Sequence, residues 1–298
     1  MLAHRHCGDR TRAGGNVKLP ALRALAFFAS VYAGHFAAPA LAQDKRCGEL
    51  VTLAGHNDSK LSYSFASLGN AKAVLLLLPG GPGFADLGPD GCARRLAGNS
   101  LIRTRDLFQA RGFATAVVDA PSNYRGPDGL GGFRIAPQHA EDLGKIVADL
   151  KKRTKLPVWI VGTSRGSISA VNAASLLSGE EAPEGLVITS PVTSGNPAGR
   201  KAWVAQTVFS VKLDAIKLPV LVVAHESDSC IRTPPGLAAS ILARTNGTRE
   251  QAVMVKGGSI PRTGASVDAC EGKTPHGFIG QEQEVTDGIV RFINGGAY

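Results

Sequence analysis

One serine of this sequence lies where its hydroxyl could act as a nucleophile. Ser164 is in the stretch "PVWIVGTSRGSISAVN", between Gly162 and Gly166, after an apolar run of strand length and before small, helix-compatible residues. A sharp turn from a buried strand to a helix needs small residues on both sides, and it exposes the hydroxyl close to a helix N-terminus. Short Gly and Ser patterns also arise by chance, so the rest of the sequence must supply the partners of a nucleophile.

A serine nucleophile needs a general base, and the base needs an acid that orients it. In a strand–turn–helix site the acid follows the serine along the chain and the histidine comes last. Asp228 lies in "VLVVAHESDSC", just past a late predicted strand, and His276 lies in "KTPHGF", before the last predicted helix. Order and placement therefore predict that Ser164, Asp228 and His276 act together.

Other carboxylates and histidines compete for these two roles. Glu226 lies in the same loop as the predicted acid and stays an alternative to it. Asp119 also ends a strand but precedes the nucleophile, and we interpret it as structural or pocket-lining. His139 falls in a predicted helix and His225 at a strand end, so each is interpreted as a surface or buried structural residue. For His56, in a predicted hairpin turn, a structural role is favoured.

Acyl transfer also needs N–H donors for the oxyanion. The segment "LLLLPGGPGF" follows the first buried strand, and its glycines let backbone N–H groups approach a reacting carbonyl closely. The expected donors are the N–H of Arg165, next after the nucleophile, and the N–H of Gly81. Taken alone, the same segment is typical of an ordinary Gly/Pro turn.

The elements that must position these residues follow a regular order. Two short antiparallel strands are predicted over 49–55 and 60–67, and strands then alternate with helices. This order predicts an α/β fold, with one mainly parallel twisted sheet, helices on both faces and antiparallel N-terminal strands. Ligands bind at the carboxyl ends of strands in such sheets. The later predicted strands are 74–78, 113–121, 158–162, 185–190, 219–228 and 250–258, and the helices are 100–112, 136–154, 167–179, 199–210, 234–246 and 281–295.

The N-terminus has the features of an export signal. A basic start is followed by the uncharged stretch "ALAFFASVYAGHFAAPALA", which ends in a small-x-small cleavage pattern before Gln43. We therefore predict a signal peptide over 1–42, a single domain over 43–298, and a periplasmic or secreted protein. A retained membrane anchor is the alternative, and translation from Val17 would give a shorter signal.

Charge and composition exclude several classes of protein. The 298 residues are 44% hydrophobic and 19% charged, which indicates a globular chain with a sizeable core. The net charge of +9 falls to +5 without residues 1–42, and no Lys/Arg cluster with interleaved aromatics remains. Nucleic acid is therefore not an expected partner. No C-x-x-C motif or His/Cys pair at zinc-ligand spacing is present, so we expect no metal site.

Four motifs together resemble the α/β-hydrolase superfamily over essentially the whole mature sequence. They are "GTSRG" as the nucleophile elbow, "PGGPG" as the oxyanion loop, "HESD" as the acid loop and "PHGF" as the histidine loop. The resemblance assigns nucleophile, acid and base to Ser164, Asp228 and His276, and the oxyanion donors to Arg165 and Gly81. The oxyanion loop is close to the H-G-G-P-G of proline-iminopeptidase-like members, but Pro takes the place of the first His.

The four cysteines of the mature chain are expected to form two disulfides, because an even number is typical of exported proteins. Spacing alone leaves three pairings open. In the fold that the resemblance implies, the acid and histidine loops lie side by side. Cys230 and Cys270 are therefore the natural partners, which leaves Cys47 for Cys92. Two free, buried thiols are the alternative.

The resemblance implies an exported, cofactor-free serine hydrolase that cleaves small-molecule carboxylic esters through an acyl-enzyme. About thirty residues separate the strands at 185–190 and 219–228, so a short or absent lid and an open site are expected. A peptidase or amidase of the same superfamily, and a non-catalytic binding protein that retains the fold, are the alternatives. Arg165 and Arg125 are compatible with an anionic acyl group, but a surface position is the more common explanation for an arginine. No stable membrane association is expected after signal cleavage.

Overall fold

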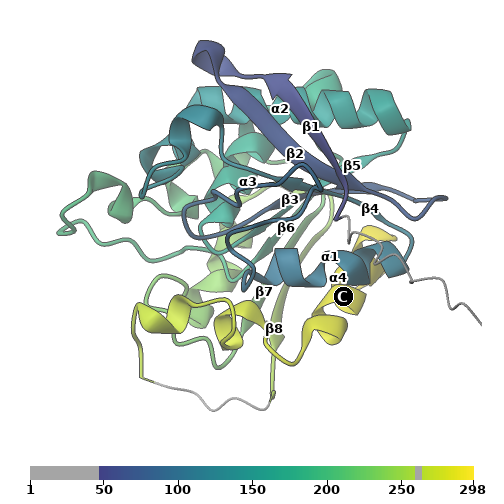
Figure 1. Ribbon diagram of the computed structural model, residues 1–298. Helices are drawn as coiled ribbons and strands as arrows, with labels where there is room; N and C mark the ends of the chain where they lie inside the picture. Colours follow the sequence, from purple (N-terminus) through teal and green to yellow (C-terminus); the bar gives the residue numbers. More distant parts are fainter. Residues whose placement is uncertain (1–46, 259–263) are drawn as a thin grey trace, which may run out of the picture. The chain divides into compact units, whose positions relative to one another are not determined.

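Apolar runs of five or six residues form the middle of an eight-stranded sheet (Figure 1). The computed structural model describes residues 47–258 and 264–298, so the predicted signal peptide, residues 1–42, lies outside the described residues. Every residue of β3 to β7 is buried, as expected for strands covered on both faces. The strands are β1 Glu49–Ala54, β2 Lys60–Ala66, β3 Val74–Leu78, β4 Ala114–Val118, β5 Val158–Thr163, β6 Gly185–Thr189, β7 Val220–His225 and β8 Glu250–Val255.

The sheet begins antiparallel and continues parallel, as the sequence predicts. The spatial order is β1-β2-β4-β3-β5-β6-β7-β8, in which β1 pairs antiparallel with β2 and β2 antiparallel with β4. All later neighbours run parallel, for example β3 and β5 with Leu76 opposite Ile160. The carboxyl ends of β3, β5 and β7 therefore lie along one edge of the sheet.

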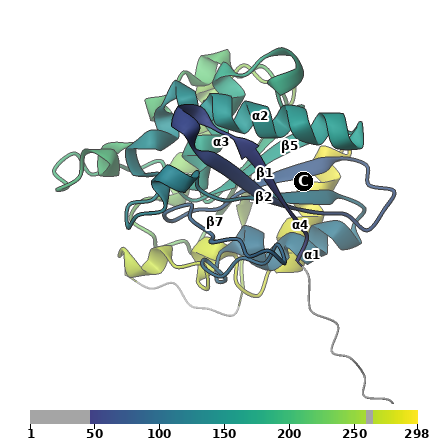
Figure 2. The same ribbon diagram turned by 45° about the horizontal axis from the view of Figure 1, so that its top comes forward.

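In the described residues, helices α1 to α4 cover the two faces of this sheet (Figures 1 and 2). α2 and α3 pack on one face with Leu76 and Ile160, whereas α1 and α4 pack on the other with Leu77 and Val161. Adjacent residues of one strand thus enter opposite cores, as the two-residue period of a strand requires. The helices are α1 Ser100–Ala110, α2 Pro137–Thr154, α3 Gly166–Leu176 and α4 Glu282–Ile293.

Two segments predicted as helices, 199–210 and 234–246, form 3-10 turns instead. In the first, Gln206 is extended and Thr207 starts a new turn, in which its side chain accepts the N–H of Phe209. Such side-chain bonds compete with helical ones and divide the segment. In the second, Pro235–Arg244, the buried residues Ala238 and Ile241 are three apart, the repeat of a 3-10 helix.

In the described part of the chain, no helix is both long and apolar enough to cross a membrane.

Candidate active site

Ser164 lies on a strained turn between β5 and α3. Its backbone φ of +51° is in the left-handed region, and its N–H donates to the carbonyl of Thr189 at 3.0 Å. Gly166 starts α3 so close to the end of β3 that a Cβ atom there would lie 2.1 Å from the carbonyl oxygen of Leu78. The small residue at this position is therefore a steric requirement. The turn places the side chain of Ser164 at the positive end of the α3 dipole.

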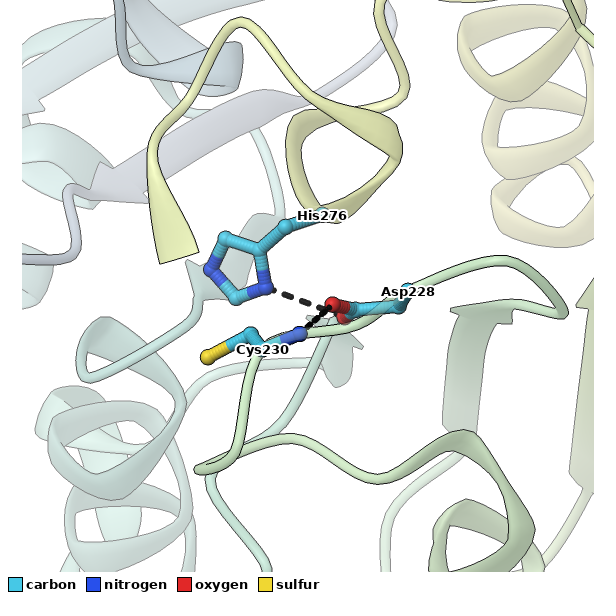
Figure 3. A group of neighbouring side chains, drawn as sticks. All are labelled: Asp228, Cys230 and His276. Atoms are coloured by element: carbon cyan, nitrogen blue, oxygen red, sulfur yellow. Dashed lines mark hydrogen bonds and ion pairs between the residues drawn. The ribbon is translucent and has the colours of Figure 1, made fainter. Parts of the chain in front are cut away.

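Asp228 and His276 form a buried pair above the carboxyl end of β7 (Figure 3). Asp228 Oδ2 lies 3.0 Å from His276 Nδ1, and Asp228 Oδ1 accepts the N–H of Cys230 at 2.9 Å. A carboxylate that accepts the Nδ1 proton fixes the ring with Nε2 free to act as a base. In the described residues, His276 Nε2 is buried without a hydrogen-bond partner.

Two hydroxyl groups that the sequence did not reveal hold this pair. The hydroxyl of Thr233 donates to Asp228 Oδ2 at 2.8 Å and lies 3.0 Å from His276 Nδ1. The hydroxyl of Ser190 donates to the carbonyl of His276 at 2.7 Å. Neither residue belongs to a motif, and their common signal is only a position shortly after a strand.

The segment after β3 has the geometry expected of an oxyanion loop. Gly81 has a φ of +58°, and the structure shows no hydrogen bond from the N–H of Gly81 or Arg165 to any described residue. The guanidinium of Arg134, which is fully buried, donates to the carbonyls of Pro79 and Gly81 at 3.4 and 3.2 Å. Arg134 therefore fixes the direction of this loop, a role that no motif in the sequence indicates.

The alternative acid and the alternative bases lie elsewhere. Glu226 is exposed, and its carboxylate accepts the N–H of Gly257. His139 is buried against Ser169, and burial, with the charge of Arg134, lowers its pKa to about 3. His225 pairs with Gln281 at 2.7 Å. The structure brings none of the three to Ser164.

The remaining two candidates have structural roles. Asp119 is buried and accepts the N–H groups of Ala85, Asp86 and Leu87, which fixes the segment that follows the oxyanion loop. Burial raises its pKa, and the N–H groups of Leu87, Ala85 and Ala120, together with the charge of Arg125, oppose that effect. His56 bonds to Asp142 and stacks on Phe133 with a ring separation of 4.6 Å.

Two cavities meet at Ser164. One, the histidine-side cavity, has a volume of about 440 Å³, and its lining includes His276, Lys273 and Asn99. The other, the arginine-side cavity, has a volume of about 250 Å³, and its lining includes Arg165, Arg232 and Trp203. Ser164, Gly81 and Cys270 line both. A group that reacts at Ser164 therefore has separate space on each side of the hydroxyl.

Two disulfides join Cys47 to Cys92 and Cys230 to Cys270, the pairing expected above. In the described residues, the one group of side chains close enough to hold a metal ion is Asp228, Cys230 and His276. The sulfur of Cys230 is in the disulfide, and Asp228 is bonded to His276. These residues therefore do not offer a free ligand set.

Comparison with known proteins gives the fold. A soluble variant of monoglyceride lipase from Saccharomyces cerevisiae has a TM-score of 0.58 and 13% identity, covering 86% of this chain and 97% of that one. A carboxyl esterase from Bacillus coagulans has a TM-score of 0.55 and 13% identity, covering 83% and 98%. Dienelactone hydrolase from Anabaena variabilis has a TM-score of 0.51 and 14% identity, covering 84% and 99%. The chain has the α/β-hydrolase fold.

The assignment of the fold rests on the structures alone, since no protein-family model matches the sequence of this chain. No curated protein matches it either.

The segment between β6 and β7 borders the candidate site. Here it spans 190–219 and contains 3-10 turns but no α-helix, so the single helix predicted there is wrong. Trp203, Val204 and Gln206 from this segment line the arginine-side cavity. The segment is therefore a wall of the cavity, and no helical lid is formed by the described residues.

Proposed function

We propose that the protein is an exported serine hydrolase that cleaves carboxylic esters through an acyl-enzyme. One observation carries the proposal. Ser164 lies on a left-handed elbow beside the same cavity as His276, whose Nδ1 is bonded to buried Asp228. Esterases and lipases among the structures of the same fold support ester hydrolysis as the reaction.

In the first step, Ser164 Oγ attacks the ester carbonyl while His276 Nε2 accepts the hydroxyl proton. Asp228 stabilises the resulting imidazolium through Nδ1. The negative charge develops on the carbonyl oxygen, which accepts hydrogen bonds from the N–H groups of Gly81 and Arg165. His276 then returns its proton to the alcohol oxygen, the carbon–oxygen bond breaks, and the alcohol leaves.

In the second step, water replaces the alcohol. His276 accepts a proton from the water, whose oxygen attacks the acyl carbon, and the oxyanion forms again at Gly81 and Arg165. Collapse of this intermediate releases the carboxylic acid and returns the proton to Ser164 Oγ. Every proton and bond is accounted for by these residues and water, so the proposed reaction needs no cofactor.

Export is part of the proposal. Two disulfides are typical of proteins that fold in an oxidising compartment such as the periplasm or the medium. The predicted signal peptide over 1–42 agrees with that compartment.

Activity on small aryl esters and labelling by a fluorophosphonate test the proposal. Ser164→Ala and His276→Ala should each lower kcat by about 10³-fold or more, with unchanged circular dichroism. Ser164→Ala should also abolish labelling. Wild-type turnover in Ser164→Ala would show that another group is the nucleophile. Faster turnover of aminoacyl amides than of esters would instead indicate a peptidase or amidase.

A further inference from the structure

The two cavities at Ser164 are not equivalent for an ester. His276 must give its proton to the departing alcohol, so the alcohol has to leave on the side where His276 lies. His276 lines the larger cavity and does not line the smaller one. In the proposed reaction the histidine-side cavity therefore takes the alcohol, and the arginine-side cavity, lined by Gly81 and Arg165, takes the acyl chain.

The arginine-side cavity concentrates positive charge. Arg134, Arg165 and Arg232 all line it, and the structure shows no ion pair between any of the three and a described carboxylate. Burial lowers the pKa of Arg165 to about 10, and the nearby charge of Arg232 acts in the same direction. Asp128, the carboxylate that opposes this shift, forms its ion pair with Lys201. Arg165 and Arg232 are half-buried, and a charge that is partly removed from water without a partner is destabilising. An anionic ligand would reduce that cost.

Arg165 and Arg232 are each held in place by one contact and keep N–H groups that can bind a ligand. The guanidinium of Arg165 lies 4.0 Å from the ring centre of Trp203, and its Nη2 is buried with no hydrogen-bond partner among the described residues. Stacking on an indole fixes the plane of a guanidinium. Arg232 Nη1 donates to the carbonyl of Val204 at 3.2 Å. A planar, fixed guanidinium with free N–H groups matches the geometry of a carboxylate.

Apolar side chains complete the lining of this cavity. Ile168, Val192, Val204 and Trp203 line it together with Ser164 and the arginines. Its volume of about 250 Å³ is below the range typical of sites for drug-sized ligands. The space thus suits a short apolar spacer that ends in a small polar group.

We propose that this cavity binds acyl chains that end in a carboxylate, so that the preferred substrates are monoesters of short dicarboxylic acids. The inference rests on the proposed ester hydrolysis and names its substrate class. The free carboxylate contacts Arg165 and Arg232, the spacer contacts Trp203 and Ile168, and the ester carbonyl reaches Ser164. Hydrolysis then releases a dicarboxylate.

The test compares kcat/KM for p-nitrophenyl hydrogen glutarate with kcat/KM for its methyl ester, in which the carboxylate is neutralised. The wild-type protein should prefer the charged ester. Arg232→Met and Arg165→Met should each lower this preference by roughly 10- to 100-fold, the effect of losing a hydrogen bond to a charged group. Arg125→Met is the matched control, because Arg125 pairs with Asp119 and lines neither cavity. It should leave the preference unchanged.

A second pair of substrates tests which cavity holds the charge. 4-Acetoxybenzoate carries its carboxylate on the alcohol side, and it should show no preference over its methyl ester. Equal kcat/KM for both glutarates in the wild-type protein would overturn the inference, and this comparison needs no variant to fold. A preference that survives both arginine variants, or a preference for the charged benzoate, would overturn it as well. If neither glutarate is hydrolysed and a fluorophosphonate does not label Ser164, the proposed function itself fails.

Discussion

The disulfide between Cys230 and Cys270 ties the acid loop to the histidine loop, and its removal should affect stability and turnover together. Cys230 donates its N–H to Asp228 Oδ1, and Cys270 is six residues before His276. The bridge closes a loop with a sequence separation of 40, which in the chain-entropy model stabilises the fold by about 4 kcal/mol. We consider the variant with both cysteines changed to alanine, which leaves no free thiol.

The second disulfide provides a control of matched size. Cys47 and Cys92 have a sequence separation of 45, so the same model gives about 4 kcal/mol for their bridge. Neither cysteine lines the two cavities at Ser164. Both double variants should therefore lower Tm by a similar amount, roughly 8 to 16 °C. Only the Cys230/Cys270 variant should lose turnover at temperatures where both variants are folded.

The size of the turnover effect follows from what still holds the two loops together. Without the bridge, Ile231 N–H still donates to Ser266, and Ser266 N–H to Ser229, at 3.2 and 3.1 Å. These bonds limit the displacement of Asp228, so we expect roughly a tenfold loss of kcat, less than the 100-fold that an error of about 1 Å can cost. Thermal unfolding followed by circular dichroism, with kcat measured well below both transitions, gives both quantities. Equal kcat in the two double variants would refute the reasoning.

Three further predictions concern Thr233, His139 and the N-terminus of the mature protein. Thr233→Val should lower kcat/KM by about tenfold because Asp228 loses a charge-assisted hydrogen bond from the Thr233 hydroxyl. Thr233→Ser keeps a hydroxyl and should restore kcat/KM. Because the folded pKa of His139 is about 3 and its ordinary value is 6.5, only the unfolded chain takes up this proton between those pH values. The free energy of unfolding should therefore fall as pH drops through this window, and His139→Gln should flatten the fall in urea titrations. Mass spectrometry of protein from the native periplasm or medium should find Gln43 at the N-terminus, whereas an intact N-terminus in a membrane fraction would support an anchor.

Patterns of apolar residues predicted the sheet because its strands are buried on both faces. A run such as Val74–Leu78 has no alternative to a buried strand once Pro79 and two glycines end it. The parallel order then follows from the alternation of strands and helices. Helices α1, α2 and α4 were also predictable from their apolar residues, because each buries one face and its apolar residues therefore recur at helical spacing.

The helix predicted over 199–210 is wrong because local hydrogen bonds determine the backbone conformation there. Over 199–210 the apolar residues have helical spacing, but Trp203 and Val204 line a cavity rather than the core. The side chain of Thr207 then bonds within its own turn. Arg134 was missed for a different reason, because its role depends on long-range hydrogen bonds to two carbonyls more than fifty residues earlier in the sequence. No periodicity or motif carries that information.

The site gathers features that cost stability, and the disulfide beside it is of the size needed to offset them. A non-glycine residue in the left-handed region, such as Ser164, costs about 1–3 kcal/mol. Arg134 adds a fully buried charge whose hydrogen bonds to the described residues go to two carbonyls and a hydroxyl. Each feature also has a role in the proposed chemistry, since the first exposes the nucleophile and the second orients Gly81. The Cys230–Cys270 bridge contributes about 4 kcal/mol in the same region. The bridge joins the acid loop to the histidine loop, so the same covalent bond that stabilises this part of the fold also keeps Asp228 against His276.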